Sequence, residues 1–114
     1  MENSHNHLTA EFLGVPAPQL RDATLLGGLM IAAASAGGFS QFGVPVVRTQ
    51  PNDGAISGVI LLESAHMAIH SLPGRQTLLL DIVAPASHDF RKAIEVFARR
   101  LSAREIKSAT RGRG

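Results

Sequence analysis

The chain has 114 residues, of which 45% are hydrophobic and only 4% aromatic, so it fits one compact domain with an aliphatic core. It contains no cysteine, which excludes disulfides, thiolate metal ligands and a catalytic thiol. The formal net charge is only +2, and no apolar run approaches the roughly 18 residues that a membrane span needs, so we expect a soluble cytoplasmic protein without a membrane partner.

The first third of the chain predicts a strand followed by a helix. His7 to Leu13 alternates enough to form a strand, and the glycine and prolines in residues 14–18 end it in a turn. Either Asp22 or Thr24 can cap a helix with one apolar stripe, which should end at the Gly37-Gly38 pair.

The middle of the chain predicts an edge strand and then a strand meander. Val44 to Arg48 is rich in β-branched residues, and Pro45 suits a sheet edge because proline cannot donate to a ladder. Turns are expected at residues 51–54 and 72–74. The strands expected around these turns are Ile56 to Leu62, Met67 to Ser71 and Thr77 to Val83.

The last third predicts the clearest helix. Ser87 can cap it, and its apolar residues from Phe90 to Leu101 follow three-four spacing. Ile106 to Thr110 could add an edge strand, while residues 1–6 and 111–114 should be mobile.

This order of elements predicts an α/β domain of the two-layer α+β kind, spanning residues 1–114, with an antiparallel sheet and two helices on one face. The run Val59-Ile60-Leu61-Leu62 lacks polar alternation and suggests burial on both sheet faces. We therefore expect the second face to be covered, by a sheet-mediated homodimer or by a homologous chain in a hetero-oligomer.

The stretch from Ser57 to His70 carries the most chemical information. It combines Ser57-Gly58, an apolar run, the pair Glu63-Ser64, and the histidines His66 and His70, and it leads into Leu72-Pro73. With its surroundings from Gly54 to Pro73, this stretch resembles the processing segment of the prokaryotic S-adenosylmethionine decarboxylase proenzymes, and the likeness extends less specifically from His7 to the Arg111-Gly112 tail.

The resemblance implies a self-processing, pyruvoyl-dependent decarboxylase of polyamine (spermidine) biosynthesis. In such a protein the chain breaks between Glu63 and Ser64, and Ser64 becomes a pyruvoyl group that replaces an external cofactor. Ser57 and His70 would assist processing and proton transfer. S-adenosylmethionine or another small amine would be the substrate, and the resemblance places His66, Met67 and Gly74 at its pocket, although Met67 is a core residue in any interpretation.

One extra residue between Gly54 and His70, relative to the family pattern, leaves two alternatives. If it precedes Ser57, the remainder aligns without a gap, and Ala65 takes the position of the pyruvoyl serine. If the extra residue is Ala65, then Ser64 keeps its place, but the one-residue shift reverses the face that Ser64 presents relative to His70. Only a β-bulge could restore that face.

Other departures from the family pattern weaken the expected substrate site. The family has a catalytic cysteine where this chain has Ala84-Pro85. It has an acidic residue after the turn proline, where this chain has Gly74, and a stacking aromatic residue where this chain has Gln50 or Pro51. These differences favour a changed substrate, poor turnover, or an uncleaved pseudoenzyme that acts as a binding or regulatory partner.

Two further patterns have a simpler interpretation. His66 and His70 lie four residues apart, which on a strand separates them by about 13 Å, so we expect no metal site. The basic cluster from Arg99 to Arg113 lacks interleaved aromatic residues and is expected to be solvated, which makes nucleic acid an unlikely partner. Asp81 matches a strand motif shared with the family and is expected to be structural.

Overall fold

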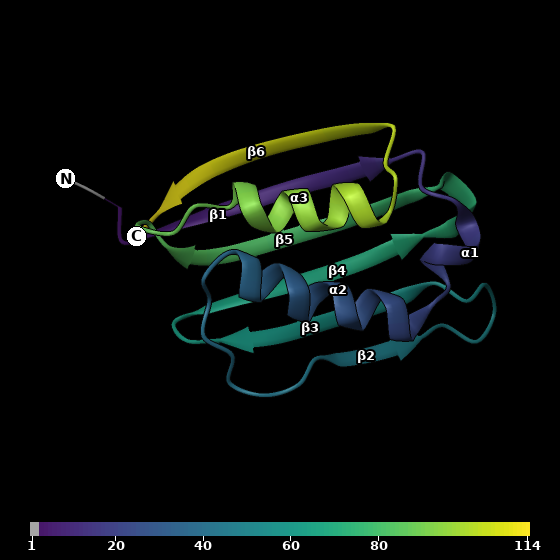
Figure 1. The fold of residues 1–114 in the computed structure, drawn as a ribbon, viewed down its shortest axis with the longest axis horizontal. Helices are drawn as coiled ribbons and strands as arrows, with labels where there is room; N and C mark the ends of the chain where they lie inside the picture. The colour runs from purple at the N-terminus through teal and green to yellow at the C-terminus, as the bar shows by residue number, and fades with distance from the viewer. Residues whose placement is uncertain (1–2) are drawn as a thin grey trace.

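The computed structural model describes residues 3–114. Met1 and Glu2, part of the terminus expected to be mobile, lie outside the described residues. Six antiparallel strands form one sheet in the order β2-β3-β4-β5-β1-β6 (Figure 1). Their bounds are β1 His5–Leu13, β2 Val46–Thr49, β3 Ile56–Leu62, β4 Ala65–Leu72, β5 Thr77–Pro85 and β6 Glu105–Arg113.

Two long helices, α2 (Ala23–Ala36) and α3 (Arg91–Arg100), lie side by side on one face of this sheet (Figure 1). A short helix α1 (Ala17–Leu20) and a 3-10 turn η1 (Pro73–Arg75) complete the elements. The aliphatic core lies between helices and sheet, where the rings of Phe12 and Phe97 are 5.8 Å apart. The predicted α+β fold with an antiparallel sheet and helices on one face is therefore confirmed, and α1 is an addition that the sequence analysis missed.

A side-chain oxygen accepts a backbone N–H in the first turn of each long helix. The Asp22 Oδ1 atom accepts the Leu25 N–H at 3.0 Å, so Asp22, one of the two predicted caps, begins α2, and Gly37 ends that helix. The predicted cap of α3 is wrong, because Asp89 rather than Ser87 accepts a first-turn N–H, that of Arg91, at 2.9 Å. Asp89 is closer to the first helical turn, which begins at Arg91.

The expected strands all form, with changed ends. β4 begins at Ala65, so only Glu63 and Ser64 connect it to β3. β2 begins just after Pro45 and forms one edge of the sheet, as expected. β6 forms the other edge, and it pairs with β1 as far as Arg113, beyond the predicted end of this strand.

The run Val59-Ile60-Leu61-Leu62 alternates in burial although all its side chains are apolar. Ile60 and Leu62 are buried toward the helices, whereas Val59 is 37% and Leu61 64% exposed on the other sheet face. We call this second surface the open face. It has no covering layer within the described chain, so the predicted burial on both faces is not achieved by this chain alone.

No helix in residues 3–114 is long and apolar enough to cross a membrane.

Candidate functional site

Ser57 and His70 come together on the open face. They are direct partners in the β3–β4 ladder, and Ser57 Oγ lies 2.9 Å from His70 Nδ1. Their hydrogen bond can run in either direction, depending on the tautomer of His70. The structure thus forms a serine–histidine pair from two of the residues that the sequence analysis selected.

Arg48 of β2 extends this pair into a row of three polar residues. It is the direct cross-strand partner of Ser57, so Arg48, Ser57 and His70 lie on three adjacent strands. The neighbouring row on the same face is apolar and consists of Val46, Val59 and Ala68. The sequence analysis missed Arg48. Strand alternation puts Arg48 on the face opposite to Val47, which was a signal for its face, but only the β2–β3 register places it opposite Ser57.

The two rows border a shallow pocket of about 250 Å³. It is lined by Val46, Arg48, Ser57, Gly58, Val59, Ala68 and His70. Gly58 packs closely against α2 from behind, because a Cβ atom at this position would lie 2.7 Å from the Met30 Cε atom, which would have to move. The pocket is therefore built on the strands that α2 supports from the other side.

Glu63 and Ser64, the expected cleavage pair, form the two-residue turn of the β3–β4 hairpin. Ser64 has a φ of 57°, in the left-handed region that non-glycine residues seldom adopt, and such backbone strain is common at functional sites. The Glu63 N–H donates to the carbonyl oxygen of Ser40 at 2.8 Å, which ties this turn to the loop after α2.

One chain does not bring the expected cleavage pair to the serine–histidine pair. Ser64 precedes His70 by six residues, and β4 is extended from Ala65 to Leu72, so about 20 Å separates the turn from His70. A side chain cannot transfer a proton across that distance. Within one chain, the residues implied by the resemblance therefore form two separate groups.

The hairpin register bears directly on the extra residue in this segment. β3 and β4 pair continuously from Ser57 with His70 to Leu62 with Ala65, and no bulge interrupts them. The bulge that would be needed to keep Ser64 in its family place is thus absent from this register. Ala65 is the first residue of β4 and is partly buried against the core.

The remaining predicted residues lie in different environments. His66 is exposed on the open face near the turn, whereas Met67 is fully buried on the helix side. Met67 is therefore a core residue, and its assignment to the substrate pocket is corrected, because strand side chains alternate between faces. Gly74 lies in η1, with open space around the position of a Cβ atom. Ala84 is buried, and Pro85 ends β5.

Asp81 is half-exposed on the open face, where its Oδ2 atom lies 3.4 Å from His7 Nε2.

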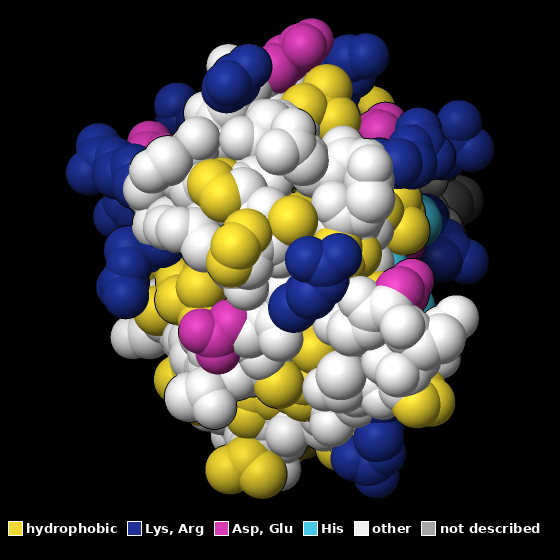
Figure 2. All heavy atoms as spheres, turned by 90° about the vertical axis from the view of Figure 1, so that its right-hand side faces the viewer, with side chains coloured by type: hydrophobic (Ala, Val, Ile, Leu, Met, Phe, Trp, Pro, Cys, Tyr) yellow, Lys and Arg dark blue, Asp and Glu magenta, His cyan; other side chains and the backbone are white. Residues whose placement is uncertain are grey.

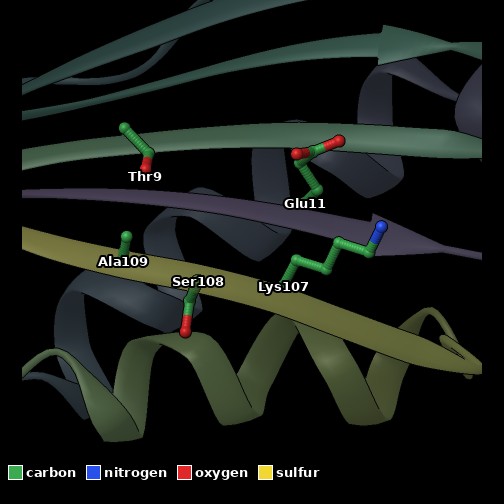
Figure 3. A pocket seen from close by; sticks show the side chains of 5 residues that line it. All are labelled: Thr9, Glu11, Lys107, Ser108 and Ala109. Carbon is green, nitrogen blue, oxygen red and sulfur yellow. The ribbon is translucent and has the colours of Figure 1, made fainter.

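A further hollow of about 180 Å³ lies over β1 and β6 (Figure 3). Glu11 and Lys107 are cross-strand partners there, so the hollow presents charges of both signs. Figure 3 shows Ser108 extending the other way, toward α3. The hollow therefore lacks the single sign of charge that Arg48 gives the pocket on β2, β3 and β4.

Basic side chains occur around much of the end of the molecule that carries α1, as Figure 2 shows. Arg21, which directly follows α1, is held by its Nε atom, which donates to the carbonyl oxygen of Asp53 at 2.9 Å. This contact fixes the loop between β2 and β3 against the start of α2.

The fold is a small α+β domain whose antiparallel sheet carries the serine–histidine pair on its open face. Residues 6–114 match the family described as S-adenosylmethionine decarboxylase, and the chain belongs to that family. It is 27% identical over 100 residues to an arginine decarboxylase proenzyme of Aeropyrum pernix, covering 87% of this chain and 76% of the relative. The crystal structure of the adenosylmethionine decarboxylase from Aquifex aeolicus has the same fold, with a TM-score of 0.86 at 20% identity over 100% of this chain and 93% of that one.

Proposed function

We propose that this chain stays uncleaved and serves as a binding or regulatory member of the decarboxylase family. The observation that carries the proposal is the unbulged β3–β4 hairpin, in which Ala65 begins β4 directly before His66. Alanine has no hydroxyl group, so a chain with Ala65 at the processing position cannot form the ester from which a pyruvoyl group arises. Ser64 is left in the turn, remote from Ser57 and His70.

The composition of the expected substrate site supports the same conclusion. The chain has no cysteine to donate a proton to a decarboxylated carbon. The buried Ala84 and Pro85, the last residue of β5, have no proton-donating side chain to replace it. Gly74 provides no carboxylate for hydroxyl groups of a substrate. The pocket of the serine–histidine pair nevertheless remains open, which suits binding without turnover.

A second candidate is an active pyruvoyl-dependent carboxy-lyase, cleaved between Glu63 and Ser64, that produces a decarboxylated amine for polyamine synthesis. It is favoured by the left-handed conformation of Ser64, which stores strain at the peptide bond to be broken. The pyruvoyl group would supply an electron-withdrawing ketone for decarboxylation. Since Ser64 lies far from His70 in one chain, this mechanism requires a second chain to complete the site.

Both candidates include a partner on the open face, either a second copy or a homologous chain. Val46, Val59 and Leu61 expose apolar surface there, at 51%, 37% and 64%. Exposed apolar patches of this kind are typical of interaction surfaces. Face-to-face contact would cover these side chains and would enclose the pocket of Ser57 and His70 as a cavity between the two chains. Assembly is therefore part of the proposal for either activity.

The mass of the purified protein under denaturing conditions tests the two candidates. An uncleaved chain gives a single species of 12.0 kDa that does not react with phenylhydrazine, a reagent for ketones. Two fragments meeting at Glu63 and Ser64, the second carrying a ketone, would overturn the proposal and establish the decarboxylase chemistry. The Ser64→Ala variant is the control, because it must stay intact if cleavage depends on the Ser64 hydroxyl.

A further inference from the structure

The pocket of Arg48, Ser57 and His70 combines a polar end with an apolar end. Its polar row runs across β2, β3 and β4, and the apolar row of Val46, Val59 and Ala68 lies two residues further along the same strands. Two residues of a strand span about 7 Å, which is the length of a short aliphatic chain. The pocket volume of about 250 Å³ is below the roughly 300 Å³ at which pockets for drug-sized molecules begin.

The polar end offers hydrogen-bond donors whichever tautomer His70 adopts. If Ser57 donates to His70 Nδ1, the other ring nitrogen carries the proton and is a donor. If Nδ1–H donates to Ser57 instead, the serine hydroxyl hydrogen becomes free to donate elsewhere. In both cases a donor remains in the pocket that Arg48, the cross-strand partner of Ser57, also lines. A ligand group that accepts two or more hydrogen bonds is the complement of this arrangement.

The charge of this end is positive and unbalanced. No acidic residue lines the pocket, and Arg48 takes part in none of the ion pairs found among residues 3–114. Within the described part of the chain, its guanidinium donates only to the carbonyl oxygen of Val47, at 3.2 Å, which leaves further N–H groups for a ligand. Asp81 is three strands away, about 14 Å, and lies against His7.

From these observations we infer that the pocket binds a small carboxylate with a short apolar chain. Arg48 binds the carboxylate together with the free donor of the Ser57 and His70 pair, and Val46, Val59 and Ala68 contact the chain. Arginine is well suited to this role because its planar guanidinium group matches a carboxylate with two parallel hydrogen bonds. The inference rests on the proposed function, in that it names the ligand class of an uncleaved binding protein.

The test is a titration of the full-length ¹⁵N-labelled chain with pentanoate, followed by the amide resonances of residues 46–48, 57–59 and 68–70. Pentan-1-ol, which keeps the chain but lacks the charge, and acetate, which keeps the charge but lacks the chain, are the ligand controls. We expect saturable shifts with pentanoate and binding at least about tenfold weaker with either control. Equal binding of pentan-1-ol, or absence of saturation, would overturn the inference.

Arg48→Gln and Lys107→Gln form a matched pair of variants. Each removes one positive charge from a residue of the open face, but only Arg48 lines the pocket. Pentanoate binding should fall at least about tenfold in Arg48→Gln and remain unchanged in Lys107→Gln. Equal losses in both variants would indicate general charge attraction and refute the site.

The intact mass of the titrated protein is also measured by mass spectrometry, which separates the carboxylate site from the proposed uncleaved state. A single 12.0 kDa species without pentanoate binding overturns the carboxylate site and leaves the uncleaved state standing. Cleaved fragments overturn the proposed function, whereas saturable binding lost in Arg48→Gln would still establish the pocket.

Discussion

Ser57 Oγ lies 2.9 Å from His70 Nδ1 across β3 and β4, while Ser64, in the turn of the same hairpin, is about 20 Å from that pair. The two ends of one hairpin thus hold groups that the chemistry of self-processing would need together. A single chain separates them because a regular antiparallel ladder keeps both strands extended. This relationship makes the hairpin the most useful place to perturb the protein.

Replacement of Ser64 by glycine should stabilise the protein. Ser64 has a φ of 57°, and glycine adopts this conformation without the steric cost that its Cβ atom imposes. We expect the free energy of unfolding in urea to rise by about 1 kcal/mol. Ser64→Val is the opposing control and should destabilise the turn, since β-branched residues are strongly disfavoured at positive φ. A loss of stability in Ser64→Gly would contradict the left-handed conformation.

Two glycine substitutions should have opposite effects. In Gly58→Ala the new methyl group would lie 2.7 Å from Met30 Cε and 3.3 Å from Ile69, which should cost about 1–3 kcal/mol through overpacking. Gly28 is exposed on α2 with nothing within 4 Å of a Cβ position, so Gly28→Ala should add about 1 kcal/mol through helix propensity. Denaturant unfolding measures both, and equal signs would be inconsistent with α2 packing on β3.

Ser71 should be the serine on β3 and β4 that matters most for stability. It is buried, its Oγ atom donates to the Leu20 carbonyl oxygen at 2.6 Å, and it accepts the Ile56 N–H at 2.7 Å. Ser71→Ala leaves both groups without a partner and should cost about 2–3 kcal/mol. Ser57→Ala removes a more exposed contact and should change stability by less than about 0.5 kcal/mol. Thermal and urea unfolding of the two variants test this contrast.

Asp89 should stabilise the start of α3 in a pH-dependent way. Its side-chain hydrogen bonds with Arg91, together with the Arg91 backbone N–H, lower the pKa of this carboxyl group from its ordinary 3.8. Because the folded pKa is lower than the unfolded one, the contribution is present above pH 3.8 and is lost as the pH falls through the lowered value. Asp89→Asn should thus reduce the melting temperature modestly at pH 7, and the difference should shrink at pH 2–3. A difference that is independent of pH would exclude an electrostatic cap.

Charge on the open face should prevent assembly of the protein. Leu61→Glu places a carboxylate in the exposed apolar surface near Val59, and an unpaired charge in a contact is costly. If the chain forms a homodimer through this face, the variant should be a monomer in analytical ultracentrifugation at concentrations where the parent chain is a dimer.

The control is Ile31→Glu, which places the same charge on the exposed side of α2 and should leave the dimer intact. Equal dissociation of both variants would place the contact elsewhere. A parent chain that is monomeric at all concentrations would leave a homologous chain as the occupant of the open face.

Local sequence signals predicted much of the fold but not its register. The apolar stripe of α3, the cap at Asp22, the glycine stop at Gly37 and the edge strand after Pro45 all depend on neighbouring residues, and they are visible without a structure. The cap at Asp89 was missed because Ser87 offered an equally suitable oxygen two residues earlier. The helix α1 was missed because its four residues carry no periodic pattern.

By itself, the sequence determined the class of fold, the family and the presence of a Ser57–His70 motif, because these depend on composition, spacing and local propensity. The tertiary structure decided that Ser57 and His70 are hydrogen-bonded and that β4 begins at Ala65 without a bulge. It also decided that Arg48 lies opposite Ser57 on the neighbouring strand. It also removed Met67, which the sequence already predicted to be a core residue, from the expected substrate pocket. The physical reason is that strand register is set by hydrogen bonds between distant segments, and a shift of one residue moves every side chain to the opposite face.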